Sequence, residues 1–374
     1  MGMFSGLRLV KDSPTLLENQ YAPAVMSSNS LWSESSLYGV AIDLDSALQV
    51  PTVSKCRQLI CGVIGGIPLE LYNKKTGAEL EKPIWLEQPD ERQPRSVTIA
   101  YTVQSLLFHQ VAYWEVTAVY KDDGRPARFA WVSNTRVTPK LNAKNTEVEY
   151  YQVDGSVRPN NGVGSLITFQ SLQPGVLLTG ARTIRAALDL EKAASIAAQT
   201  PVPSGFIKNS GADMPDTQIQ AILAAWKAAR QTRSTAYLTS TLDYQATSFS
   251  PKDMMYDEAK QSLSTEICRL MNVPAYMASS DASGNSMTYQ NVLEARKEFF
   301  AYTLAPFVNA IEDRLSMNDI TNSQNIVKFA ADDTFLRADA TVRLATIEKL
   351  LALELITKEQ AMAMEDLTPN GDAS

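Results

Sequence analysis

The stretch that most constrains this chain runs from Ser250 to Met317, where two long apolar helical patterns flank a short polar segment. At its start, Ser250 is suited to cap a helix, Pro251 fits the first helical position, and Asp253 follows three residues after the cap. Pro274 predicts the end of this helix, because proline disfavours the helical conformation of the residue before it. The predicted buried side carries Met254, Met255, Leu263, Ile267, Leu270 and Met271 at helical spacing.

The polar segment ASSDASGNSMT can bury little apolar area, so a mobile loop is predicted there. A second helical pattern, QNVLEARKEFFAYTLAPFVNAIEDRL, follows it. Pro306 lies inside this pattern and predicts a kink, since proline lacks a backbone donor and clashes with the preceding turn. The predicted apolar side of this helix consists of Val292, Phe299, Leu304, Phe307, Ile311 and Leu315.

Composition narrows the class of protein. The chain has 374 residues, 45% of them hydrophobic, which predicts a soluble globular protein with one large or two moderate cores. Its formal net charge of −7 makes a sequence-specific DNA-binding protein a poor candidate, because such proteins need a basic surface for phosphates. The three cysteines, Cys56, Cys61 and Cys268, lack paired spacing, so they are predicted to be reduced core residues rather than disulfides or zinc ligands.

Motifs for catalysis are weak. His109 is the single histidine, which excludes a triad built on any other histidine, and a structural role is the better interpretation. The glycines lack the spacing of a phosphate-binding loop. The pair Asp332 and Asp333 could hold Mg²⁺, although solvated surface carboxylates are the simpler interpretation, and a serine–lysine pair has no supporting pattern. No cofactor and no metal ion are therefore expected.

Sorting signals are also missing from the sequence. The start MGMFSGLRLVKD lacks the sustained apolar run of a signal peptide, and Gly6 stands where a myristoylation signal needs Ser or Thr. The apolar run from Leu59 to Leu69 is too short to cross a bilayer. We expect no membrane partner and maturation in the cytoplasm.

Local patterns predict alternating helices and strands before residue 180. Residues 1–48 show little periodicity and are predicted to be either an arm that contacts a neighbouring subunit or a disordered tail. Thr52 is predicted to cap a helix that ends at Gly65 and Gly66. The remaining predicted elements are a strand at 67–72, a helix at 97–108, strands at 112–120, 129–132 and 137–141 in one sheet, and a hairpin around Asp154 and Gly155.

A small insert is predicted between two long helices. The helix at 183–199 carries Ile184, Leu188 and Ile196 on one side. The insert comprises SGFIKNSG, a helix that starts at Asp216 and shows Ile219, Ile222, Leu223 and Trp226 on one face, and a strand at 235–242. Its basic residues Lys208, Lys227, Arg230 and Arg233 outnumber Asp213 and Asp216, which fits either a partner surface or a solvated helix face.

The C-terminal part is acidic. A strand at 326–330 precedes residues 332–374, where most of the excess negative charge lies. Leu344, Ile347, Leu350 and Leu351 predict an amphipathic helix. Thr357 and Gln360 have the spacing of a capping box and predict a further helix.

In this order, the patterns resemble the portal protein family of long-tailed bacteriophages. The resemblance lies in EICRLMNVPAYM at 266–277, the serine-rich loop with Asn285, YTLAPFVNAIEDRL at 302–315 and FLRADATVR at 335–343. It continues in VSKCRQLICGVIGGIPLELY at 53–72 and in SGFIKNSG at 204–211, so it spans nearly the whole chain. The chain departs from the family at His109-Gln110-Val111, where the family usually carries a glycine-bearing motif.

The resemblance implies an α+β portal fold with a mixed α/β wing, a helical stem, a small α/β clip, a kinked long helix with a tunnel loop, and a helical crown. The implied boundaries are an N-terminal arm at 1–48, the first part of the wing at 49–181, a stem helix at 182–200, the clip at 201–249, a second stem helix at 250–273, the tunnel loop at 274–289, the rest of the wing at 290–331 and the crown at 332–374.

The resemblance also implies a function. A homo-oligomeric ring, usually a dodecamer, would sit at one vertex of the phage capsid, admit double-stranded DNA without regard to sequence, and belong to the virion. Implied partners are the terminase large subunit, the major capsid protein and head-completion or adaptor proteins. The implied sites are a DNA-facing tunnel loop with Ser279, Ser280, Asp281, Ser283, Asn285 and Ser286, a clip partner surface with Lys208, Lys227, Arg230 and Arg233, and a helix kink at Pro306.

Two other classes stay open at the level of sequence. One is a metal-dependent DNA-processing enzyme, which the acidic pair Asp332 and Asp333 would serve. The other is an adaptor protein of the phage particle that has no axial channel. A ring with a central hole would separate the portal interpretation from both.

Overall fold

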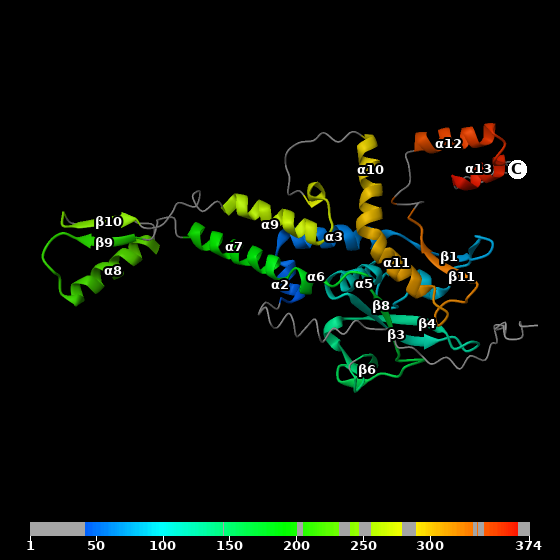
Figure 1. The fold of residues 1–374 in the computed structure, drawn as a ribbon, viewed down its shortest axis with the longest axis horizontal. Helices are drawn as coiled ribbons and strands as arrows, with labels where there is room; N and C mark the ends of the chain where they lie inside the picture. The colour runs from blue at the N-terminus through cyan, green and yellow to red at the C-terminus, as the bar shows by residue number, and fades with distance from the viewer. Residues whose placement is uncertain are drawn as a thin grey trace, which may run out of the picture.

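The computed structural model describes residues 42–144, 146–199, 205–231, 240–246, 256–278, 289–331, 335 and 340–365. Figure 1 shows a body of helices and small sheets, from which two long helices extend toward a separate unit of two strands and one helix. A helical hairpin lies at the opposite side of the body, near the C-terminus. This mixture of helices and antiparallel strands agrees with the α+β class predicted from the sequence.

The helical layer of the body is centred on α3. Its elements are α2 (Leu44–Leu48), α3 (Pro51–Gly66), α4 (Ile84–Glu87), α5 (Arg95–His109) and α6 (Val176–Thr179). Helices α3 and α5 pack closely at Gly65, where a Cβ atom would lie 2.8 Å from the carbonyl oxygen of Ser96. A glycine is therefore needed at this crossing.

The start of α3 differs from the prediction that Thr52 caps it. The cap position is occupied by Val50, which has extended backbone angles and no side-chain capping bond, and Pro51 is the first helical residue. Proline suits this position because the amide hydrogen that it lacks would have no partner inside the helix. Thr52 lies within the helix instead, and its hydroxyl donates to Ser264 Oγ over 3.0 Å, which links α3 to α9 (Tyr256–Leu270).

Three antiparallel sheets belong to the body. Their strands are β1 (Leu69–Asn73), β2 (Glu79–Leu80), β3 (Val111–Val119), β4 (Pro126–Val132), β5 (Val137–Leu141), β6 (Val148–Val153), β7 (Ser156–Val157), β8 (Leu166–Gln170) and β11 (Asn325–Phe329). The orders are β11-β1-β2, β4-β3-β8 and β5-β6-β7. Strand β1 thus pairs with a strand from far along the chain, in a register that joins Leu69 to Phe329.

The prediction that residues 137–141 continue the sheet of β3 and β4 is wrong. A short 3₁₀ turn, η1 (Asn134–Arg136), follows β4, and β5 then pairs with β6 in a sheet of its own. The two sheets still touch through a small apolar cluster of Tyr113, Val132, Val137 and Val153. Alternation of apolar and polar residues identifies a strand but not its partner, which is why the sequence did not separate them.

The main core surrounds Trp114 on β3. Its indole ring is fully buried, with centroids 5.2 Å from Phe129 and 4.8 Å from Phe169. The indole nitrogen donates to Thr102 Oγ1 over 2.8 Å, and this hydroxyl donates in turn to the carbonyl of Thr98 over 2.7 Å. Trp114, Thr102 and Thr98 thus form a chain of hydrogen bonds that gives the buried indole nitrogen and the buried Thr102 hydroxyl a partner each.

Two long helices and the outer unit form the extension. The helix pair consists of α7 (Ala181–Gln199) and α9. The outer unit consists of β9 (Gly205–Asn209), α8 (Asp216–Gln231) and β10 (Leu242–Ala246). The strand predicted at 235–242 is thus described only from Leu242 onward, since residues 232–239 lie outside the described residues.

The second half of the chain contains the predicted kinked helix. It begins as α10 (Tyr289–Phe299), passes through the π-helical turn η3 (Phe300–Leu304) and continues as α11 (Ala305–Leu315), and Figure 1 shows α10 and α11 running in different directions. Five of the six residues predicted for its apolar side are buried, whereas the side chain of Val292 lies outside the described residues.

The C-terminal hairpin consists of α12 (Ala340–Ala352) and α13 (Lys358–Met364). The predicted capping box is present: the amide of Thr357 donates to Gln360 Oε1 over 2.9 Å, and the amide of Gln360 donates to Thr357 Oγ1 over 3.2 Å. Arg343 closes the hairpin with two bonds to the carboxylate of Glu365. Within the amphipathic helix, Ile347 is buried but Leu344 and Leu351 are exposed.

Glu312 on α11 provides a pH-dependent test of the body. Burial raises the pKa of this carboxyl, although the amide of Phe329, which donates to Oε1 over 2.7 Å, and the charge of Lys328 partly oppose the shift. A raised pKa in the folded state gives stability that is present below the unfolded-state pKa and is lost as the pH rises through the folded-state pKa. The ionised group therefore opposes folding at neutral pH.

Glu312→Gln is expected to keep the acceptor for Phe329 and remove the charge. The free energy of unfolding at pH 7 should rise by up to about 1 kcal/mol, with the gain shrinking toward pH 4. Urea unfolding across this pH range measures the effect. Glu312→Leu is the matched control, because it leaves the Phe329 amide unpaired and should lose stability at every pH. A Gln variant that is weaker at pH 7 would contradict the assignment.

Candidate functional site

The helix pair is anchored in the body at its root. At Gly180, directly before α7, a Cβ atom would lie 2.1 Å from Leu270 Cδ2 at the end of α9, so the start of one helix touches the end of the other. Around this contact Ile184 on α7 and Ile267 on α9 are completely or almost completely buried. The two helices therefore leave the body together, antiparallel and side by side (Figure 1).

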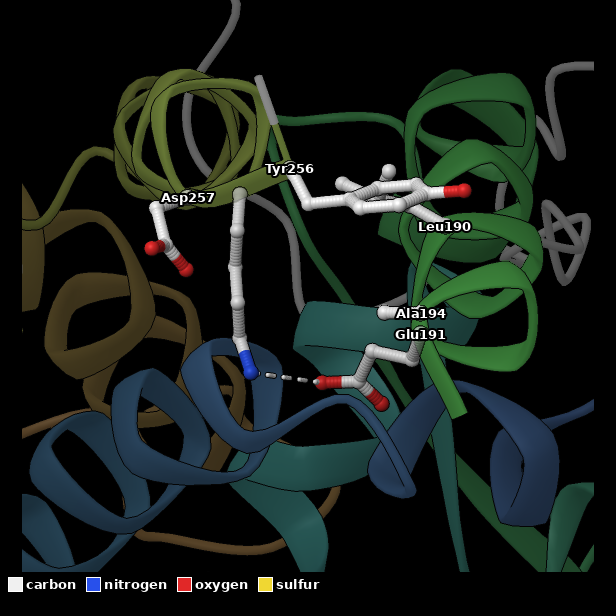
Figure 2. Close-up of a pocket in the computed structure, with 6 residues that line it drawn as sticks. Leu190, Glu191, Ala194, Tyr256 and Asp257 are labelled. Carbon is white, nitrogen blue, oxygen red and sulfur yellow. Dashed lines mark ion pairs between the residues drawn. The ribbon is translucent and has the colours of Figure 1, made fainter. Parts of the chain in front are cut away.

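A pocket lies between the two helices farther out. Figure 2 shows its lining: Leu190, Glu191 and Ala194 from α7, and Tyr256, Asp257 and Lys260 from α9. The Lys260 ammonium lies 3.7 Å from Glu191 Oε1 and bridges the pair. Because both side chains are partly exposed, this ion pair contributes at most about 1 kcal/mol. Its chemistry is that of a helix–helix contact, with no histidine or cysteine among the lining residues.

Apolar surface remains uncovered toward the free end of the pair. Ile196 was predicted to lie on the same side of α7 as Ile184, which is fully buried, yet the side chain of Ile196 is 55% exposed. The difference follows from the architecture, since the body covers α7 only near its root. One large apolar side chain of the described helix pair is thus left in contact with water.

The outer unit carries two of the predicted basic residues at described positions. Trp226 of α8 stacks on Tyr244 of β10 with ring centroids 5.2 Å apart, so the face that carries Tyr244 turns toward the helix. Lys208 occupies the alternate position on β9, opposite Asp243, and is exposed on the other face. Lys227 is exposed on α8. The structure therefore does not bring Lys208 and Lys227 together on one face.

The other predicted site residues are described in part or not at all. Arg230 lies within α8, but its side chain is outside the described residues, and Arg233 is outside them entirely. All six loop residues, Ser279, Ser280, Asp281, Ser283, Asn285 and Ser286, also lie outside them. The described chain stops at η2 (Ala275–Ala278) and resumes at α10.

Sequence reasoning missed the junction at Asn272. This residue follows α9 with φ of +53°, and its side-chain amide donates to the carbonyl of Tyr302 in η3 over 2.6 Å. Thr303 Oγ1 donates back to the carbonyl of Asn272. Pro306, the predicted kink residue, occupies the second position of α11, directly after η3. An asparagine shortly before Pro274 was the available signal, because asparagine tolerates the left-handed conformation that ends helices.

The thiols and the histidine behave as structural residues. Cys56, Cys61 and Cys268 are all buried, as predicted, and burial raises the pKa of Cys61 to about 12. Burial lowers the pKa of His109, which favours its neutral form. The adjacent Gln110 adopts φ of +70° at the end of α5, a conformation for which glycine is the usual residue. Among the described residues, no group of three or more potential metal ligands occurs.

Comparison with known families gives a match over residues 51–366 to the model described as phage portal protein. The chain belongs to the phage portal protein family. The match includes the body from α3 onward, the helix pair, the outer unit and the C-terminal hairpin, so it confirms the resemblance that the order of the sequence patterns indicated. The family is structural rather than catalytic.

A curated relative and solved structures agree with the family. The probable portal protein of Streptomyces phage phiC31 is 24% identical over 363 residues, which cover 89% of this portal-family chain and 78% of the relative. A crystal structure of an HK97 family phage portal protein from Corynebacterium diphtheriae matches with a TM-score of 0.65, at 20% identity, over 80% of this chain and 99% of that one.

Two particle structures also share the portal fold. The neck of an empty GTA particle, computed with C6 symmetry, matches with a TM-score of 0.58 at 18% identity, over 88% of this chain and 96% of that one. The neck of a native GTA particle, computed with C12 symmetry, matches with a TM-score of 0.54 at 19% identity, over 86% and 91% of the two chains. At these identities the likeness establishes the fold. Within the described part of the chain, no helix combines the length and apolar character needed to span a bilayer.

Proposed function

We propose that this chain assembles into a closed ring through which double-stranded DNA enters and leaves a phage head. The observation that carries the proposal is the family match across residues 51–366, in a fold whose helix pair projects from a compact body. The symmetric necks of the two GTA particles support a ring, since their chains share this fold and were computed with rotational symmetry. A C12 arrangement would correspond to a dodecamer.

We assign each group of described elements to a place in such a ring. The body, including α10 and α11, would be the wing, and α7 with α9 would be the stem around the channel. The outer unit would be the clip, and the hairpin of α12 and α13 would be the crown. Exposed apolar residues such as Ile196 and Leu344 would then lie against neighbouring subunits, because ring contacts bury apolar surface that a single chain leaves open.

The segment around Ser279 to Ser286 would face DNA as the tunnel loop. Ser279, Ser280, Ser283, Asn285 and Ser286 offer uncharged hydrogen-bonding groups for phosphates, which position DNA without reading its sequence. Asp281 adds a negative charge. A dense set of lysines or arginines here would hold the phosphates strongly and slow translocation. The acidic net charge of the chain, −7, fits the same requirement for weak adhesion.

The outer unit would receive the partners outside the capsid. We assign the docking of the terminase large subunit, and later of head-completion or adaptor proteins, to the clip surface that contains Lys208, Lys227, Arg230 and Arg233. Since Lys208 and Lys227 occupy different faces, this surface would wrap around the unit rather than form one patch. The major capsid protein would contact the wing. The ring would belong to the virion after assembly in the host cytoplasm.

Negative-stain images of the purified chain are expected to show annular particles with a central hole, and native mass spectrometry should give one closed stoichiometry. A strictly monomeric species under all conditions would overturn the proposal. Incubation with plasmid DNA and Mg²⁺ is the control for the alternative of a DNA-processing enzyme, and we expect no cleavage. The acidic pair Asp332 and Asp333, on which that alternative rested, lies outside the described residues.

A further inference from the structure

The end of α9 is closed by a defined backbone motif. The amide of Asn272 donates to the carbonyl of Arg269 over 3.1 Å, and the amide of Val273 donates to the carbonyl of Cys268 over 2.9 Å. Together with φ of +53° at Asn272, these bonds form a Schellman motif. The backbone of Asn272 is thus fixed, and its side chain points from a rigid base.

From this base Asn272 reaches the other long helix. Its side-chain nitrogen donates to the carbonyl of Tyr302 over 2.6 Å, and its own carbonyl accepts from the Thr303 hydroxyl. Both partners lie in η3, the π-helical turn between α10 and α11. The end of α9 and the turn that follows α10 are therefore joined at one residue.

The bonded carbonyl is the one that an α-helix would leave without a donor. In an α-helical register the carbonyl of Tyr302 would pair with the amide of residue 306, but that residue is Pro306, which has no amide hydrogen. Asn272 supplies a donor in its place. The π turn also holds one residue more than an α turn, so its conversion to α-helix would rotate α10 by roughly 100° relative to α11.

We propose that Asn272 is a register lock: it holds the π turn of η3 and thereby fixes the rotation of α10 about its axis relative to α11. It acts as a positioning residue, and its consequence for DNA rests on the proposed function of the 279–288 segment. Asn272 and Tyr302 are exposed to water, which competes for their hydrogen bond, whereas Thr303 is buried, so the lock is of moderate strength.

Two variants at Asn272 separate the lock from the backbone motif. Asn272→Gly keeps the left-handed conformation at no steric cost and deletes the donor. Asn272→Asp keeps the shape and places a carboxylate oxygen against the Tyr302 carbonyl. Thr303→Val removes the reciprocal bond without changing Asn272. The matched control is Asn142→Asp, since the Asn142 side chain donates within its own turn, to Thr146.

Amide hydrogen exchange of assembled full-length chains is the first measurement. We expect the amides of residues 300–305 to exchange about threefold to tenfold faster in all three variants, as the loss of one hydrogen bond predicts, with the control unchanged. A second measurement uses spin labels on introduced cysteines at Glu266 and at Arg296 or Lys297, which are exposed, whereas the native cysteines are buried. If the π turn converts to α-helix, α10 rotates by roughly 100°, and its label should move to about the position that the neighbouring residue holds in the wild type. The distance between the two labels should change accordingly.

The outcomes distinguish the lock from the function that it serves. Unchanged exchange in η3 and unchanged label distances in both Asn272 variants would overturn the lock. A uniform rise in exchange throughout the body would do the same, because it would indicate general destabilisation. If η3 and α10 shift but the rings retain DNA like the wild type, the lock stands and the DNA-facing role of the 279–288 segment fails.

Discussion

Rings built from a chain that lacks Ser280 to Ser286 are expected to assemble normally and to package or retain no DNA. The deletion removes all but Ser279 of the polar residues that we place against the phosphates, whereas the elements of the body, the helix pair and the outer unit remain present. Packaging is measured as DNA protected from nuclease inside particles, and assembly by native mass spectrometry. Intact rings with unaltered packaging would refute the DNA-facing role of the segment.

A variant of unchanged length gives the matched control. Replacing Ser280, Ser283, Asn285 and Ser286 by alanine removes these hydrogen-bonding groups but keeps the length of the segment. This variant therefore shows whether a loss of DNA in the deletion variant comes from the missing groups or from the shorter connection. We expect partial loss of DNA retention. Because the removed contacts are uncharged, the loss of DNA retention should change little with salt concentration. The loss of contacts made by lysine or arginine would depend strongly on salt concentration.

Trp114→Ala is expected to have the largest effect on stability. The variant removes a fully buried indole between Phe129 and Phe169 and leaves a cavity, which costs about 3–5 kcal/mol. It also removes the donor to Thr102 Oγ1. A loss of this size is comparable with the whole stability of many domains, so most of the chain should be unfolded or aggregated. Urea unfolding followed by far-UV circular dichroism measures it.

A pair of conservative variants tests the role of the hydrogen bond. Trp114→Phe should cost about 2–3 kcal/mol, since it loses the bond to Thr102 as well as volume. Trp131→Phe should cost less than about 1.5 kcal/mol, because the indole nitrogen of Trp131 is buried without a hydrogen-bond partner among the described residues. Equal losses in the two variants would contradict the contribution of the Trp114–Thr102–Thr98 chain.

Periodic patterns predicted most of the fold. The apolar side of the kinked helix, the helix at 97–108, the Asp154–Gly155 hairpin and the capping box at Thr357 were all identified from residue types at fixed spacing. These features are local, so the information lies within a few residues. The family resemblance added what local patterns lack, which is the order in which such elements combine.

The predictions that failed concern features that depend on residues far away in the sequence. Thr52 has the chemistry of a cap, but the cap is Val50 and the helix begins two residues earlier than predicted, because Pro51 fits its first turn and Ser264 on α9 engages the Thr52 hydroxyl. The partner of β5 is chosen by the following hairpin rather than by its own alternation. Ile196 continues the stripe of α7 beyond the reach of the body.

The candidate site was harder to predict than the fold. The loop residues and the basic residues were selected by residue type. Whether such residues act together depends on which face of the fold each one occupies. Lys208 and Lys227 illustrate this, since strand alternation puts one on the face away from α8. The junction at Asn272 depends on a carbonyl of a helix thirty residues later, which no local pattern indicates.

The pairing of β1 with β11 has a consequence for synthesis of the chain on the ribosome. The middle strand of the β11-β1-β2 sheet emerges early, yet its neighbour β11 is the last of the described strands to leave the exit tunnel. Until then the body lacks one edge of this sheet, and long-range pairing of this kind closes slowly. Completion of this sheet must therefore wait until residues 325–329 have been synthesised.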